Sequence, residues 1–157
     1  MSVRASLPLL VALAAAIAAP GGSSAQGRAT SSADSAGVRA AVLDYVEAIY
    51  RVDTSRVGRS VRPELAKRGY YIPRGQSAYV NEPMTFQQLI ETAKTWNKSG
   101  RVDADRAPKE IRILDLLDQT ASAKLVAQWG VDYMHLAKYD GRWMIVNVLW
   151  QTPPPAH

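Results

Sequence analysis

Two polar side chains stand among large apolar neighbours on one predicted face of the segment from Gly130 to Trp150, near the end of this 157-residue chain. They are Asp132 and Asn147, and their neighbours are Trp, Ile, Leu and Met. A carboxylate and an amide in such surroundings cost free energy unless they are hydrogen-bonded. Asp132 could therefore be the acceptor, or the general base, at the polar end of a pocket. The alternative is a structural hydrogen bond from Asp132 to a helix or loop, and the residue types leave both possibilities open.

A predicted hairpin brings these two residues together. The dipeptide Asp140-Gly141 between strand-like runs is typical of a type I′ turn, because both central residues of that turn need positive φ. With a two-residue loop, the pairing proceeds outward one residue at a time, which places Asp132 and Asn147 one diagonal step apart on one face. The side chains of this face that are expected to line a pocket are Asp132, Asn147, Trp143, Ile145 and Met134.

Both faces of the predicted hairpin are largely apolar, although one face of an antiparallel sheet commonly meets water. Helices can cover only one of the two faces. The simplest cover for the other is a second subunit in a two-fold dimer, and loops or the chain's own tail are the alternative. The expected interface residues are Trp129, Tyr133, His135, Val146, Val148 and Trp150.

Helical patterns precede the strands. A first helix is expected from Asp34 or Ser35, and a short second helix after Asp53 or Thr54. The buried stripe of the first helix is expected to comprise Val38, Ala41, Val42, Tyr45 and Ile49, which recur at helical spacing.

A third helix is expected from Thr85, which forms a T-x-x-Q capping box with Gln88. From Lys109 onward the apolar period changes from 3.6 to about 2, which predicts strands. Helices followed by hairpin-linked strands indicate an α+β fold with an antiparallel sheet. The predicted strands cover 110–117, 123–139 and 142–151, with shorter pieces at 70–72 and 78–80.

Residues 1–25 are typical of a secretory signal peptide, with Arg4 before an apolar stretch and small residues before Gln26. The apolar stretch is about 13 residues long, too short for the roughly 20 that span a bilayer, so no stable membrane anchor is expected. We expect a secreted or periplasmic bacterial protein. Its domain would cover 34–152, after a disordered linker at 26–33 and before a Pro-rich tail at 153–157.

Composition excludes several kinds of site. The chain has no cysteine and only two histidines, His135 and His157, so thiolate and His-rich metal sites are excluded and no metal or cofactor is expected. The segment 51–74 is rich in Arg and Lys. It could meet an anionic partner, such as a phosphorylated ligand or a membrane surface, or it could form a solvated basic face. Nucleic acid is not an expected partner of an exported protein.

The hairpin also carries a family resemblance. Its residues are similar to the end of a nuclear transport factor 2-like domain, also called SnoaL-like or cystatin-like, and most similar to the subgroup labelled "putative lumazine-binding". The resemblance spans roughly 35–151. The residues that carry it are Asp132, Tyr133, Leu136, Lys138, Gly141, Trp143, Ile145, Val146 and Asn147.

The resemblance implies a cone in which a curved antiparallel sheet wraps around about three N-terminal helices, with a pocket inside and frequent dimers through the sheet. Tyr45 and Tyr79 are then expected to line the pocket. Such folds host both enzymes and binding domains. The first hypothesis is an exported, non-catalytic domain that binds a small organic ligand. The alternatives are an isomerase, cyclase or dehydratase with Asp132 as base, and a protein-interaction module.

Overall fold

The computed structural model describes residues 32–154. The predicted signal peptide, most of the predicted linker and the last three residues of the tail lie outside the described residues. The helices within that range are α1 (Ser32–Tyr50), α2 (Thr54–Ser60) and α3 (Phe86–Thr95). The strands are β1 (Val61–Tyr71), β2 (Val80–Met84), β3 (Lys109–Leu116), β4 (Thr120–Ala127), β5 (Gly130–Tyr139) and β6 (Arg142–Gln151).

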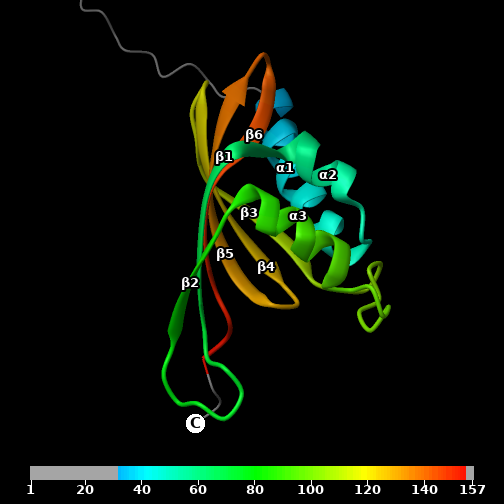
Figure 1. Ribbon diagram of the computed structural model, residues 1–157. Helices are drawn as coiled ribbons and strands as arrows, with labels where there is room; N and C mark the ends of the chain where they lie inside the picture. The colour runs from blue at the N-terminus through cyan, green and yellow to red at the C-terminus, as the bar shows by residue number, and fades with distance from the viewer. Residues whose placement is uncertain (1–31, 155–157) are drawn as a thin grey trace, which may run out of the picture.

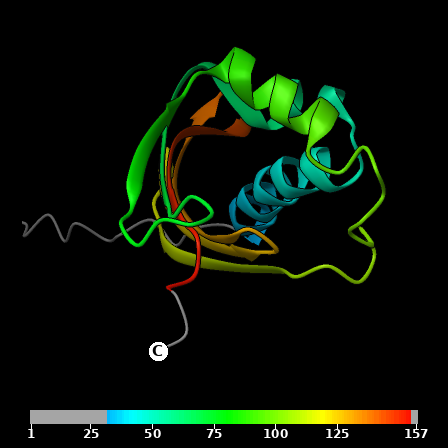
Figure 2. The same ribbon diagram turned by 60° about the horizontal axis from the view of Figure 1, so that its bottom comes forward.

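The strands form one curved sheet in the order β2-β1-β6-β5-β4-β3. The helices pack on one face of this sheet (Figure 1). Seen from below, the sheet curves around α1 while α3 lies across its open side (Figure 2). The predicted α+β cone is confirmed. One pair differs from the expected antiparallel sheet, because β1 runs parallel to β6. That pairing joins distant segments, so no hairpin signal could have revealed it.

The helices follow their sequence signals. All five residues of the predicted stripe of α1 are buried. The side chain of Asp53 accepts a hydrogen bond from the backbone N–H of Ser55 and caps α2. Both hydrogen bonds of the capping box between Thr85 and Gln88 are present at the start of α3. Local capping chemistry therefore sets where α2 and α3 begin, whereas α1 begins at Ser32, before the expected Asp34 or Ser35.

Strand β1 is the element that the sequence patterns largely missed. Only its end was expected, at 70–72, whereas it covers eleven residues. Its burial alternates over Leu65, Lys67 and Gly69, all on the inner face. A lysine and a glycine occupy positions where a strand pattern normally shows apolar residues, which hid the period of two.

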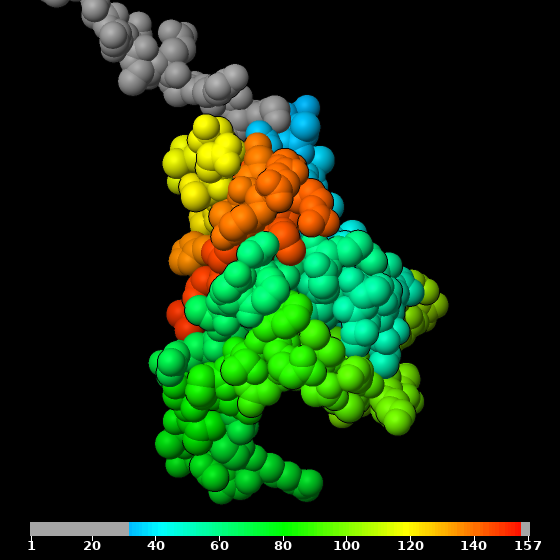
Figure 3. Space-filling model, turned by 45° about the horizontal axis from the view of Figure 1, so that its top comes forward, coloured from blue at the N-terminus to red at the C-terminus, as the bar shows by residue number. Residues whose placement is uncertain are grey.

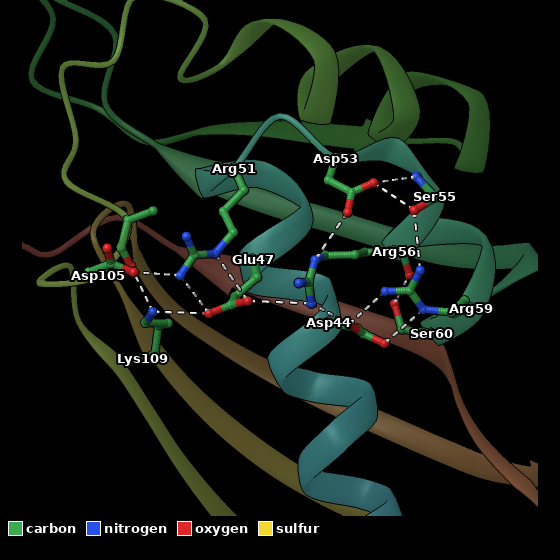
Figure 4. Close-up of polar contacts among 11 residues, drawn as sticks. Asp44, Glu47, Arg51, Asp53, Ser55, Arg56, Arg59, Ser60, Asp105 and Lys109 are labelled. Atoms are coloured by element: carbon green, nitrogen blue, oxygen red, sulfur yellow. Dashed lines mark hydrogen bonds and ion pairs between the residues drawn. The ribbon is translucent and has the colours of Figure 1, made fainter.

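The basic residues at the start of the 51–74 segment form ion pairs (Figure 4). Arg56 Nη1 lies 2.6 Å from Asp44 Oδ1 and 3.3 Å from Glu47 Oε2. Arg59 Nη2 lies 3.1 Å from Asp44 Oδ1, and Arg51 Nε lies 3.2 Å from Glu47 Oε2. Acidic residues of α1 compensate these guanidinium groups, which favours the structural interpretation over an anion-binding site.

The predicted long strand at 123–139 is wrong, because a turn at Gln128-Trp129 divides it into β4 and β5. Gly130, with a φ of 139°, follows that turn. A Cβ at this position would lie 2.1 Å from the carbonyl oxygen of Gln151, so only glycine fits. The continuous apolar pattern on both sides concealed the break.

The predicted register between β5 and β6 holds from the turn as far as the pair Leu136 and Ile145. A bulge at Val146 then shifts the pairing by one residue, so that Asn147 lies opposite His135 instead of Met134. A one-residue shift moves every later side chain to the other face. The prediction that Asn147 shares a face with Asp132 is therefore wrong.

Candidate functional site

A cavity of about 260 Å³ lies between the inner face of the sheet and helices α1 and α3. In the space-filling view the molecule is hollowed between the β1–β2 hairpin and the segment that follows α3 (Figure 3). The walls are mainly aromatic and aliphatic, with a few polar groups. The lining residues are Tyr45, Ile49, Lys67, Glu82, Met84, Leu89, Thr92, Trp96, Trp129 and Trp150.

The polar centre of the cavity is Lys67 of β1, whose residue is only 7% exposed. Its Nζ donates a hydrogen bond of 2.8 Å to the hydroxyl oxygen of Tyr45 on α1. The same ammonium group lies 5.4 Å from the ring centre of Tyr45 and 5.3 Å from that of Trp150. Aromatic rings at such distances stabilise a cation that has lost most of its water.

Asp132 of β5 is fully buried and lies beside Trp129 and Tyr45. The indole Nε1 of Trp129 donates a hydrogen bond of 3.0 Å to its Oδ1. Its Oδ2 is buried and has no partner in hydrogen-bonding geometry among residues 32–154, although Tyr45 is near enough to influence the carboxylate. Asp132 itself does not line the cavity.

Burial has the largest effect on the pKa of each of these three groups. It raises the pKa of Asp132, against the lowering effects of the Lys67 charge, Trp129 and Tyr45. It lowers the pKa of Lys67 to about 8, although the charges of Asp132 and Glu82 act in the opposite direction. It raises the pKa of Tyr45 well above its ordinary value, with Asp132 adding to the shift. Tyr45 is thus a neutral hydroxyl between two groups of opposite charge.

The aromatic wall is held by the turn between β4 and β5. The ring of Trp129 packs edge-on against Tyr45, Tyr50 and Trp96, with centroids 6.3, 5.5 and 5.5 Å away. The Tyr50 hydroxyl accepts a hydrogen bond of 2.7 Å from the backbone N–H of Gln128. This bond fixes the turn that carries Trp129 and so shapes the cavity.

The residues that were expected to line one pocket do not lie together in the structure. Tyr45 lines the cavity, whereas Met134 and Ile145 belong to the packed core. Trp143 is also buried, but it packs against α1, where its indole donates to Asp34 Oδ1 at 3.0 Å.

The other two expected pocket residues lie elsewhere. Asn147 donates from its side-chain amide to the carbonyl oxygen of Ala66, on the face opposite Asp132. Tyr79 is 40% exposed, and its hydroxyl accepts a hydrogen bond from Gln151.

The expected interface residues also divide. Tyr133 and His135 are exposed on the outer face of the sheet, and Val146 is half-buried in the bulge. The other three were placed on the wrong face, since the turn and the bulge were not anticipated. They are Trp129 and Trp150, which line the cavity, and Val148, which is fully buried in the core.

Sequence reasoning missed the main polar group, Lys67, because it was counted among the charges of a basic segment. The signal that could have found it is the period of two through Leu65, Lys67 and Gly69. The further cavity residues that it missed are Ile49, Glu82, Met84, Leu89, Thr92 and Trp96.

Within residues 32–154, no group of three or more His, Asp or Glu side chains is arranged to hold a metal ion. None of the helices in that range is long and apolar enough to cross a membrane.

This curved sheet around α1, with an inner cavity, is the nuclear transport factor 2-like fold. A protein of this kind from Shewanella baltica, described as NTF2-like and of unknown function, is 18% identical, with a TM-score of 0.59 over 80% of this chain and 99% of that one. One from Methylobacillus flagellatus is 20% identical, with a TM-score of 0.56 over 80% of this chain and 96% of the other. One from Silicibacter pomeroyi is 18% identical, with a TM-score of 0.53 over 73% of this chain and 91% of the other.

Residues 33–151 match the model of the family described as "Putative lumazine-binding", and the chain belongs to that family. No curated protein matches it.

Proposed function

We propose that this domain binds a small, planar molecule with a hydrogen-bond acceptor in the cavity between α1, α3 and the inner face of the sheet. The observation that carries the proposal is the Lys67–Tyr45 pair, a hydrogen-bonding centre enclosed by aromatic walls. Ligand sites typically combine such apolar walls with a few fixed polar groups. A cavity of about 260 Å³ suits a molecule of one or two rings.

The charges of the site favour a neutral ligand that carries a hydrogen-bond acceptor. The charge of Lys67 is already balanced by Asp132, and Glu82 adds a negative charge at the cavity wall. A strongly anionic ligand would therefore be repelled, whereas a carbonyl oxygen could accept a hydrogen bond from Lys67 or Tyr45. Lumazine, the molecule in the family's description, is a fused-ring dicarbonyl compound and meets these requirements.

The position of Asp132 supports binding without catalysis over the isomerase-type alternative. A general base must reach the proton that it abstracts, directly or through one water. Asp132 is fully buried, does not line the cavity and already accepts a hydrogen bond from Trp129. Its negative charge instead supports the buried Lys67 and orients the indole of Trp129.

The test is a titration of the purified protein with lumazine, followed by tryptophan fluorescence and thermal stabilisation. Trp96, Trp129 and Trp150 line the cavity, so quenching is expected on binding. Lys67→Met should weaken binding roughly 10- to 100-fold, the cost of one hydrogen bond to a charged group. Asn147→Leu, on the other face of the sheet, is the control and should bind normally.

The same titration can contradict the proposal. Thr92→Trp places a large side chain into the cavity wall, and it should abolish binding whether or not Lys67 contributes. If lumazine and other one- or two-ring carbonyl compounds fail to bind, or bind equally well to Thr92→Trp, the cavity is not a binding site.

We also propose that the domain works outside the cytoplasm. The support is the signal-like pattern of residues 1–25. Expression of the full chain in a bacterium should yield a protein in the periplasm or medium that begins at Gln26. An intact N-terminus in the cytoplasmic fraction would contradict this proposal.

We propose further that two copies associate through the outer face of the sheet. Within residues 32–154, the helices cover the inner face only (Figure 1). Tyr133 and Leu149 lie opposite each other on neighbouring strands of the outer face and are 50% and 44% exposed. Adjacent large apolar side chains on central strands favour a self-complementary contact.

A further inference from the structure

We propose that Lys67 forms a covalent imine with aldehydes or ketones that enter the cavity. The ligand class would then be small apolar carbonyl compounds, held by condensation with the lysine amine. This inference rests on the proposed binding function, because the cavity must first admit the compound.

Lys67 differs from a purely structural lysine in its hydrogen-bond partner and in its access to the cavity. A buried structural lysine normally donates directly to a carboxylate. Among the described residues, the hydrogen-bond partner of Lys67 is instead the hydroxyl of Tyr45. Lys67 also lines a cavity large enough for a second reactant. By contrast, Lys94 on α3 is half exposed and pairs with Glu91 at 2.7 Å.

Burial also supplies the reactive form of the amine. Only a neutral amine can attack a carbonyl carbon. Burial lowers the pKa of Lys67 to about 8, against the effects of Asp132 and Glu82. At pH 7 roughly one-tenth of Lys67 would be neutral, about 200-fold more than for an ordinary lysine with a pKa of about 10.4.

The groups around Lys67 fit both steps of imine formation. The amine nitrogen bonds to the carbonyl carbon and gives a carbinolamine, with Tyr45 placed to donate a proton to the oxygen and to regain one from the nitrogen. The C–O bond then breaks, and the carbonyl oxygen leaves as water with the two hydrogens of the amine. The imine nitrogen then takes up one proton from water, and the negative charge of Asp132 stabilises the resulting cation. No oxidant or reductant is needed.

The test is reductive trapping with benzaldehyde and sodium cyanoborohydride on the purified full chain. The expected result is one benzyl group, located at Lys67 by peptide mass mapping. Lys94→Arg should leave this labelling unchanged, and Lys67→Arg should abolish it. Tyr45→Phe should slow the labelling several-fold, because the proton donor is lost while the ring remains.

Labelling that spreads over exposed lysines, with Lys67 no faster than Lys94, would overturn the inference even if Lys67→Arg fails to fold. Lumazine binding, measured in parallel, separates the two proposals. Binding of lumazine without benzylation of Lys67 would refute imine formation and leave the binding function intact. Absence of both would refute both. Protection of Lys67 from benzylation by lumazine would place both events in one cavity.

Discussion

At the scale of single residues, the chemistry depends on Lys67, Tyr45 and Asp132. Each is almost fully buried, yet they come from three elements: β1, α1 and β5. Two buried charges that are separated by a neutral hydroxyl are an expensive arrangement for stability alone. We infer that the site serves to bind a ligand, and that its cost should be visible in the stability of the fold.

The stability should therefore rise with pH above neutrality. Lys67 has a folded-state pKa of about 8 and an unfolded one near 10.4, so between these values the unfolded chain binds the extra proton. The free energy of unfolding then increases with pH, by about 1 to 2 kcal/mol between pH 7.5 and 9.5. Urea unfolding measures this slope. The interval ends below pH 10 because the raised pKa of Tyr45 acts in the opposite direction above it.

Lys67→Met should remove that increase, and Lys94→Met should keep it. Equal slopes in the wild type and Lys67→Met would mean that Lys67 does not lose its proton on folding in this range.

Gly69 controls the position of a cavity wall. A Cβ at this position would lie 1.8 Å from Cε2 of Trp150. Gly69→Ala should therefore displace the indole, destabilise the fold by about 1 to 3 kcal/mol and weaken ligand binding. Tryptophan emission and urea unfolding measure these effects. Gly58→Ala is the matched control, because no atom of the described part of the chain lies within 4 Å of its added Cβ, and it should be neutral or stabilising.

At the scale of elements, local signals were reliable where local chemistry decides the outcome. The capping box at Thr85, the stripe of α1 and the Asp140-Gly141 turn are all present as predicted. Strand β1 and the division of 123–139 were missed, because burial by distant segments decided them. The predictions of site residues were the least accurate, because the face on which a strand side chain lies depends on the register, and the predicted register was wrong beyond the bulge.

The capping box of α3 should support the cavity as well as the helix. Thr85→Ala removes the side-chain acceptor for the backbone N–H of Gln88 and should cost about 1 kcal/mol in urea unfolding. Because α3 supplies Leu89 and Thr92 to the cavity wall, ligand affinity should fall as well. Gln87→Ala, an exposed change on the same helix, should have little effect on either. An equal loss in both variants would argue against a specific role of the cap.

At the scale of the whole molecule, the sheet has one face for the cavity and one that α1, α2 and α3 do not cover. If the outer face joins two copies, the protein should be a dimer at micromolar concentration by light scattering. Leu149→Arg should give monomers, because it places a charge at the centre of the contact. Leu117→Arg, in a 58% exposed position beyond β3, should remain dimeric. A monomeric wild type would refute the dimer.

The amino-acid sequence by itself determined the fold class, the helices that cap themselves, the final hairpin and the family to which these belong. It could do so because periodicity, caps and turns act over a few residues. Only the tertiary structure decided that β1 pairs with β6, that a bulge turns Asn147 away from Asp132, and that Lys67 meets Tyr45 inside the cone. These depend on contacts between distant segments and on a register in which one residue reverses every face.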